Sequence, residues 1–92
     1  MTDILQLHLS LSDDSVESRV GDETVLLHLG TGTYFGLDAV GTRIWESLKE
    51  GLAPAEVCAR LVVEYSADPA DIEADARRFL TALLEHGLLR TG

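Results

Sequence analysis

The 92-residue chain lacks several features that would assign a sequence quickly to a class of protein. It has one cysteine, Cys58, so no internal disulfide can form and the fold cannot depend on one. Its first residues include no basic segment of the kind that opens a secretory signal. No apolar stretch approaches the roughly 20 residues of a membrane span. We therefore expect a cytoplasmic protein without a membrane partner.

Basic residues are also scarce. Lys and Arg number 7 against 16 Asp and Glu, and the formal net charge is −9. Proteins that bind nucleic acid or anionic membranes need a basic face to contact phosphates. The charge balance therefore speaks against nucleic acid as a partner and favours a partner that is neutral or basic.

The chain is short, but it has enough apolar residues for one core. An apolar content of 46% argues against a disordered chain. A length of 92 residues allows one domain, so we expect residues 1–92 to fold as a single unit. A domain of this size rarely holds both a deep substrate pocket and a set of catalytic groups. An adaptor or binding module is therefore expected in preference to an enzyme.

The chain up to Asp38 alternates polar and apolar residues with a period of two, which is typical of strands. Leu5–Ser12 alternates without a fault and predicts a half-buried strand. Thr24–Leu29 and Thr33–Leu37 predict two more strands, joined by a short glycine-containing hairpin loop. Val16–Val20 fits either an irregular connection or a short strand extension. The expected inner face of the middle strand is formed by Val25, Leu27 and Leu29.

After Asp38 the apolar residues recur at the spacing of helices. Asp38 can cap a first helix over Ala39–Lys49, and Pro54 fits the first turn of a second helix. A third helix opens at Asp68-Pro69 and ends before Gly87. Its apolar stripe consists of Ile72, Ala76, Phe79, Leu80, Leu83 and Leu84. The order β-β-β-α-α-α predicts an α+β, winged-helix-like domain, in which a three-stranded antiparallel sheet is followed by three helices.

Residues able to carry chemistry are few, and their spacing forms no known catalytic or metal motif. His8 and His28 fall on the polar faces of their strands, and Cys58 lies beside an apolar helix stripe. A metal site needs three or four convergent ligands, and cysteine catalysis needs a base and an orienting group. Because the sequence points to none of these, we expect no catalytic residues, no metal site and no cofactor.

The predicted edge strand, Thr33–Leu37, carries Tyr34 and Phe35 and no charge. Proteins usually protect a free edge with charge or proline, because an open edge invites another strand. An open edge beside an apolar helix is the geometry for binding an extended peptide by strand addition. Alternatively, Tyr34 and Phe35 complete the core and the first helix covers the edge. Spacing alone favours neither alternative.

Two other functions stay open at this point. The winged-helix look suggests DNA binding by the third helix, although that helix has five acidic residues against only Arg77 and Arg78. DNA phosphates would repel such a helix from the major groove. An uncharged edge can also pair with its own copy, which would make the chain a self-associating regulatory module.

The run Leu29–Leu48, which spans the hairpin loop, the third strand and the first helix, resembles the signature of the PqqD-like family. The second half of the chain is similar as well, at Pro54, Tyr65, Asp68–Asp75, Phe79-Leu80 and Gly87–Leu89. This family includes the RiPP recognition elements, which are small peptide-recognition domains of ribosomal natural-product pathways. The resemblance implies three strands followed by three helices, in agreement with the order expected from the residues.

The resemblance also implies a function. Such domains bind the leader segment of a precursor peptide and present it to a modifying enzyme, without catalysing a reaction themselves. Stand-alone members of this size occur in lasso-peptide pathways. The implied partners are therefore the precursor leader peptide, a leader peptidase and, as a further candidate, a macrocycle-forming cyclase.

Site residues follow from the same resemblance. The leader adds as a strand to the third strand of the family's sheet and lies in a cleft against the third helix. For this chain the resemblance implies backbone pairing by Thr33, Tyr34, Phe35, Gly36 and Leu37. It implies groove lining by Ile72, Asp75, Ala76, Phe79 and Leu83. One departure is Ala53, because the family usually has Ser or Thr at this cap position before Pro54, and this bears on the stability of the helix end.

Overall fold

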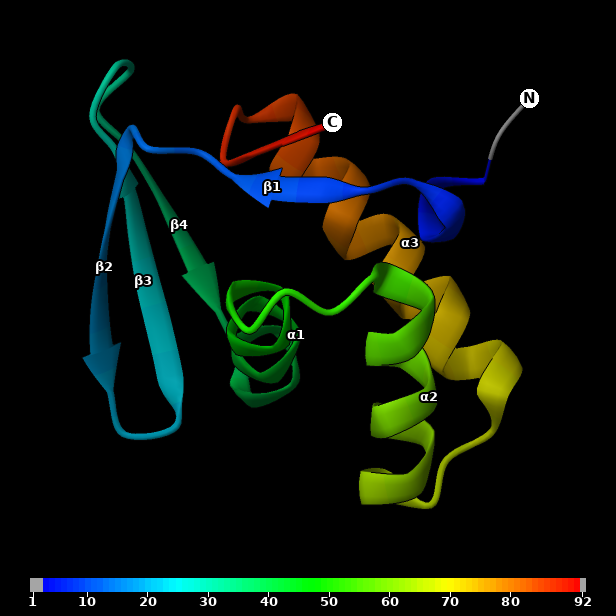
Figure 1. Cartoon of the computed structure of the whole chain (residues 1–92). Helices are drawn as coiled ribbons and strands as arrows, with labels where there is room; N and C mark the ends of the chain where they lie inside the picture. The colour runs from blue at the N-terminus through cyan, green and yellow to red at the C-terminus, as the bar shows by residue number, and fades with distance from the viewer. Residues whose placement is uncertain (1–2, 92) are drawn as a thin grey trace.

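The computed structural model describes residues 3–91 (Figure 1). A short 3₁₀ turn at Ile4–Gln6 comes first, and three helices and five strands follow. In chain order these are β1 (Leu9–Leu11), β2 (Ser15–Val20), β3 (Glu23–His28), β4 (Thr33–Leu37), α1 (Ala39–Lys49), α2 (Pro54–Tyr65), α3 (Pro69–Glu85) and β5 (Leu89–Thr91). The bounds of α1 and α3 and the start of α2 agree with the sequence prediction.

The main sheet is antiparallel and has three strands in the order β2-β3-β4. The predicted α+β class and the meander are therefore confirmed, but the first strand of the meander was assigned to the wrong segment. It is Ser15–Val20, which the sequence left ambiguous, and not Leu5–Ser12. The physical reason is that Glu17 and Arg19 of β2 point toward α1 while Val16 and Val20 are exposed, so the pattern of β2 does not look like that of a half-buried strand.

Leu5–Ser12 has a different role. Leu5 lies in the 3₁₀ turn and is buried, and this turn packs against α2 and α3. Leu9–Leu11 then pairs with β5, with Leu9 opposite Thr91 and Leu11 opposite Leu89. Figure 1 shows this second, two-stranded sheet crossing beside the C-terminal end of α3. The alternating leucines of this segment therefore pack against the helices and not in the main sheet.

The inner face of β3 is also the opposite of the one expected. Thr24 and Leu26 are buried, whereas Val25 and Leu29 are exposed. The hydroxyl of Thr42 on α1 donates to the hydroxyl oxygen of Thr24 (3.0 Å), and this pair satisfies both groups inside the core. Because the polar Thr24 lies on the inner face, the apolar pattern of the sequence indicated the opposite face of β3.

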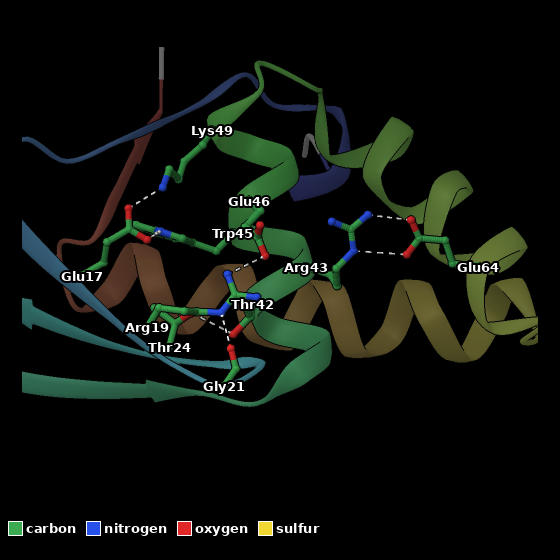
Figure 2. Close-up of polar contacts among 10 residues, drawn as sticks. All are labelled: Glu17, Arg19, Gly21, Thr24, Thr42, Arg43, Trp45, Glu46, Lys49 and Glu64. Atoms are coloured by element: carbon green, nitrogen blue, oxygen red, sulfur yellow. Dashed lines mark hydrogen bonds and ion pairs between the residues drawn. The ribbon is translucent and has the colours of Figure 1, made fainter.

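Helix α1 is fixed to the sheet by polar contacts (Figure 2). The fully buried Trp45 donates its indole N–H to a carboxylate oxygen of Glu17 on β2 (3.2 Å). Lys49 forms an ion pair with Glu17, and the Arg19 guanidinium lies 3.2 Å from a carboxylate oxygen of Glu46. These contacts explain why β2 turns Glu17 and Arg19 inward.

The helix starts are capped by nearby side chains. A carboxylate oxygen of Asp38 accepts from the N–H of Gly41 (2.7 Å), and one of Asp68 accepts from the N–H of Ala70 (2.8 Å), as predicted. At α2 the side chain of Glu56 accepts from the N–H of Ala53 (3.0 Å), which partly compensates for the missing cap hydroxyl. Within residues 3–91, every helix is too short or too polar to cross a bilayer.

A groove beside the edge of the sheet

Strand β4 is an edge strand of the main sheet. It pairs with β3 on one side, and among residues 3–91 no strand pairs with its other side. Figure 1 shows β4 running toward the start of α1, as the strand of the main sheet nearest to the helices. The free edge therefore lies on the side of the sheet where the helices are.

The hydrogen-bond pattern identifies which backbone groups of β4 face this edge. In an antiparallel sheet the N–H and C=O of one residue point to the same neighbouring strand, and those of the next residue point to the opposite side. The N–H of Leu29, directly after β3, donates to the carbonyl oxygen of Asp14 (2.8 Å), on the side of β2. By alternation the backbone N–H and C=O of Leu26 point toward β4, and those of its partner Phe35 point back toward β3.

The remaining alternation assigns Tyr34 and Gly36 to the free edge. Both residues direct their N–H and C=O away from β3. Each therefore offers one donor and one acceptor to an added strand. Thr33, Phe35 and Leu37 use their backbone groups inside the sheet.

A groove of about 490 Å³ lies between β4, the first half of α1 and α3. Its lining is mostly apolar, with carboxylates and one guanidinium among the polar groups. The lining residues are Phe35, Asp38, Val40, Gly41, Ile44, Asp75, Arg78, Phe79 and Ala82. An apolar cleft beside an open strand edge can hold the side chains of an extended peptide.

The charged groups of the groove are already engaged. The carboxylate of Asp38 caps α1, and Asp75 forms an ion pair with Arg78 one turn further along α3. Both members of this ion pair are largely exposed, so it contributes little to stability. The groove is thus an apolar cleft with an exchangeable ion pair at its mouth.

His28 and His86 lie between the β3–β4 hairpin and the end of α3. The rings of Phe35 and His86 lie 5.3 Å apart between centroids. The N–H of Thr31 donates to Nδ1 of His28 (3.2 Å). A Cβ added at Gly87, whose φ is +74°, would lie 3.0 Å from Nε2 of His28. The end of α3 therefore packs directly on the β3–β4 hairpin.

The expected site residues fall into three groups. Phe35, Asp75 and Phe79 line the groove, whereas Thr33, Tyr34 and Gly36 are exposed along β4. Leu37 is buried, and the half-buried Ile72 packs on the core. Ala76 and Leu83 are also core residues, with 1% and 0% of their surfaces exposed, so neither lines the groove.

The sequence prediction missed the residues that α1 contributes, namely Asp38, Val40, Gly41 and Ile44, and it missed Arg78 and Ala82 on α3. On α3 the groove face runs along positions 75, 78, 79 and 82, at helical spacing. The core stripe runs along 76, 80 and 83, one position further on. The one signal in the sequence was the width of the apolar stripe, because Phe79 lies beside the core positions 76, 80 and 83 and not among them.

Cys58 on α2 is buried and does not line the groove. Burial raises the pKa of the Cys58 thiol, so it stays protonated and is a poor nucleophile. Among residues 3–91, no three His, Cys, Asp or Glu side chains gather as a metal site would require. The geometry provides a binding surface.

A family model decides what kind of domain this is. The model of Coenzyme PQQ synthesis protein D (PqqD) matches residues 23–89. The chain belongs to the PqqD family. The resemblance noted in the sequence is confirmed, and stand-alone PqqD-family domains are non-catalytic peptide-binding proteins. None of the curated proteins matches the chain.

Two solved structures have the same fold. TbiB1 in complex with the TbiA(beta) leader peptide is 52% identical, with a TM-score of 0.83, and the match covers 88% of this chain and 94% of TbiB1. A lasso peptide synthetase B1 complexed with the leader peptide is 28% identical, with a TM-score of 0.82. That match covers 90% of this chain and 98% of the synthetase chain. Both proteins hold a leader peptide.

Proposed function

We propose that this PqqD-family chain is a non-catalytic adaptor that binds the leader segment of a ribosomally synthesised precursor peptide by strand addition to β4. The observation that carries the proposal is the free edge at Tyr34 and Gly36, which runs beside the apolar groove between β4 and α3. The leader peptides held by the two similar proteins support it. The backbone ladder gives affinity, and the groove gives selectivity.

The magnitudes require both parts of the site. Tyr34 and Gly36 can form four backbone hydrogen bonds with the leader, each with a net contribution of roughly 1 kcal/mol. Two apolar side chains in the groove would add about 2 kcal/mol each. Ordering a flexible leader costs roughly 2–5 kcal/mol, and association itself costs more. Useful affinity therefore needs the groove as well as the edge.

The enzyme that acts on the bound precursor needs a docking surface near the leader. The outer face of the main sheet is apolar and exposed at Val16 and Val20 on β2. Because β4 belongs to the same sheet, an enzyme on this part of the face would lie next to the bound peptide. We infer that a leader peptidase docks here, with a macrocycle-forming cyclase as the second candidate.

We further propose that the product is a lasso peptide and that the protein works in the cytoplasm as a single domain. The similarity to the lasso peptide synthetase B1 supports the product class. The acidic residues of α3 give no support to the DNA-binding alternative. Self-association through β4 remains a competitor of leader binding, and light scattering with and without leader peptide distinguishes the two.

The proposal is tested by Tyr34→Pro. Proline removes the N–H that faces the free edge and costs no hydrogen bond within the sheet. We expect the affinity for the TbiA(beta) leader peptide, or for the leader encoded beside this protein, to fall by roughly ten-fold or more. Fluorescence anisotropy with labelled leader measures the change.

Two control variants separate the backbone effect from other causes. Tyr34→Ala removes the same ring but keeps the N–H, so it should bind the leader better than Tyr34→Pro. Ser15→Pro places a proline on the free edge of β2, at the other side of the sheet, and should bind normally. Equal binding by Tyr34→Pro and the wild type would exclude strand addition.

A further inference from the structure

The outer face of the main sheet carries its side chains in rows across the strands. The strand register places Val16, Leu27 and Tyr34 in one row. The next row consists of Ser18, Val25 and Gly36. The first row ends at the free edge on a tyrosine that is 69% exposed, whereas the second ends there on a glycine, which has no side chain.

Neither the backbone nor the packing of the protein explains this glycine. The φ of Gly36 is not in the left-handed region, and a Cβ at this position would meet no atom within 4 Å. A glycine inside a strand weakens it, and it often marks a place where a ligand approaches closely. Gly36 therefore leaves a gap on the outer face, bordered by Tyr34 along β4 and by Val25 across the sheet. We call this gap the Gly36 notch.

The notch lies where a bound peptide would place a side chain. Gly36 directs its N–H and C=O to the free edge, so a residue of the added strand pairs directly with it. Side chains of paired residues stand on the same face of a sheet. The side chain of that peptide residue therefore projects on the outer face, level with Gly36 and Val25.

Resting on the proposed leader binding, we propose that the Gly36 notch selects an aromatic side chain in the bound peptide. The ring lies across Gly36, contacts Val25 and flanks the ring of Tyr34. Val25 is 36% exposed and has no side chain beside it at the free edge. Two strand spacings, about 10 Å, separate β3 from an added strand, and a long flat side chain is needed to cover that gap. Aromatic residues compensate for glycines in this way across paired strands.

The proposal adds a second recognition element on the opposite side of the peptide from the groove. Successive side chains of a strand point to opposite faces. The residue paired with Gly36 therefore enters the notch, and the residues before and after it point toward the apolar groove at Phe35 and Phe79. The expected peptide signature is an aromatic residue with an apolar residue directly beside it.

The variant Gly36→Val fills the notch and keeps the backbone N–H. Because valine is a better strand former than glycine, the free protein should melt at a higher temperature than the wild type. Its affinity for a peptide with the aromatic residue should fall by about ten-fold, since the ring loses its place beside Tyr34 and over Val25. Ser18→Val is the matched control, because it makes the same kind of change in the same row at the far edge of the sheet and should not alter peptide affinity.

The experiment uses an mRNA-displayed library of random peptides, selected in parallel on wild-type protein, Gly36→Val and Ser18→Val. Hydrogen exchange at β4 then shows whether the selected peptides pair with that strand. We expect an aromatic residue at one fixed position among β4-pairing peptides from the wild type and from Ser18→Val, and its loss with Gly36→Val.

The other outcomes each overturn one defined statement. If peptides pair with β4 but show no fixed aromatic position, or if Gly36→Val selects the same peptides, the notch proposal is wrong and leader binding by strand addition stands. If no selected peptide protects β4 from exchange, strand addition fails, and the notch proposal fails with it.

Discussion

The two outer strands of the main sheet are built in opposite ways. Both β2 and β4 expose one row of backbone groups at an edge. On β2 the side chains of Glu17 and Arg19 turn inward and bond to α1. On β4 there is no charged residue, and Tyr34 and Gly36 present their backbone groups beside an apolar groove.

The difference shows how one small sheet can have a protected edge and an available edge. Charged residues on an edge strand discourage pairing with another chain. In this protein the charges on β2 have a second role, because they attach the strand to α1. The absence of charge on β4 leaves that edge free for a ligand. The comparison predicts that damage to the β2 side lowers stability, whereas damage to the β4 side lowers peptide affinity.

The largest effect is expected on the β2 side, at Trp45. Trp45→Ala removes a fully buried ring and the N–H that bonds to Glu17, and it should lower the free energy of unfolding by about 3–5 kcal/mol. Chemical denaturation followed by circular dichroism measures the loss.

Trp45→Phe is the matched control for the ring. It keeps most of the volume and loses the N–H, so its cost should be about 1–2 kcal/mol. The folded fraction of this variant should bind leader peptide as the wild type does. A strong loss of affinity in Trp45→Phe would contradict the separation of the two edges.

On the β4 side, at Gly41, we expect a smaller effect, which lowers peptide affinity and leaves stability nearly unchanged. A Cβ added there would lie 3.0 Å from Cε1 of Phe79 and 3.3 Å from a carboxylate oxygen of Asp38, so the Phe79 ring, which lines the groove, must move. Gly41→Ala gains helix propensity, which offsets the strain, and the unfolding free energy should change by less than about 1 kcal/mol. Leader affinity should fall several-fold, by about 1 kcal/mol, as judged by fluorescence anisotropy.

The double variant Gly41→Ala/Phe79→Leu tests the cause of that loss. The smaller leucine gives the new methyl group room, so the two changes should be less harmful together than their sum. Strict additivity would show that the alanine does not act through Phe79.

The smallest effect, on stability alone, is expected at the ion pair between Asp3 and Arg77, which lies at neither edge of the main sheet. Asp3 joins the start of the chain to α3, with its carboxylate oxygens 2.7 Å and 3.1 Å from nitrogens of Arg77. The hydrogen bond from Arg77, and then the one from the N–H of Leu5, hold the pKa of Asp3 below its ordinary value of 3.8. A lowered pKa in the folded state means that the contact stabilises the protein above pH 3.8 and is lost as the pH falls through the lowered pKa.

Asp3→Asn should therefore be slightly less stable than the wild type at neutral pH, and the two melting temperatures should converge in acid below pH 3.8. Leader affinity should be the same in both proteins. A difference in melting temperature that persists at the lowest pH would show that the charge of Asp3 is not the cause.

Much of this architecture is predictable because it depends on local chemistry. Asp38 and Asp68 cap helices, and Gly87 adopts the left-handed conformation that ends α3, as the sequence indicates. The edge position of β4 also follows from the hairpin before it and the helix after it. Each of these features needs only neighbouring residues.

What the sequence did not predict depends on contacts between distant elements. The strand character of β2 was missed because Glu17 and Arg19 face inward, and only the position of α1 makes that favourable. Ala76 and Leu83, which the resemblance assigned to the groove, lie in the core, because one residue of helix rotation separates a core face from a groove face. That rotation is set by tertiary packing.

The single tryptophan gives the protein an intrinsic spectroscopic reporter. Trp45 is sealed from solvent, bonds to the carboxylate of Glu17, and follows the groove residue Ile44 directly in the chain. Its emission thus originates at the contact between α1 and β2, with no competing indole. Fluorescence can therefore follow the loss of the contact between α1 and β2 during unfolding without an attached dye.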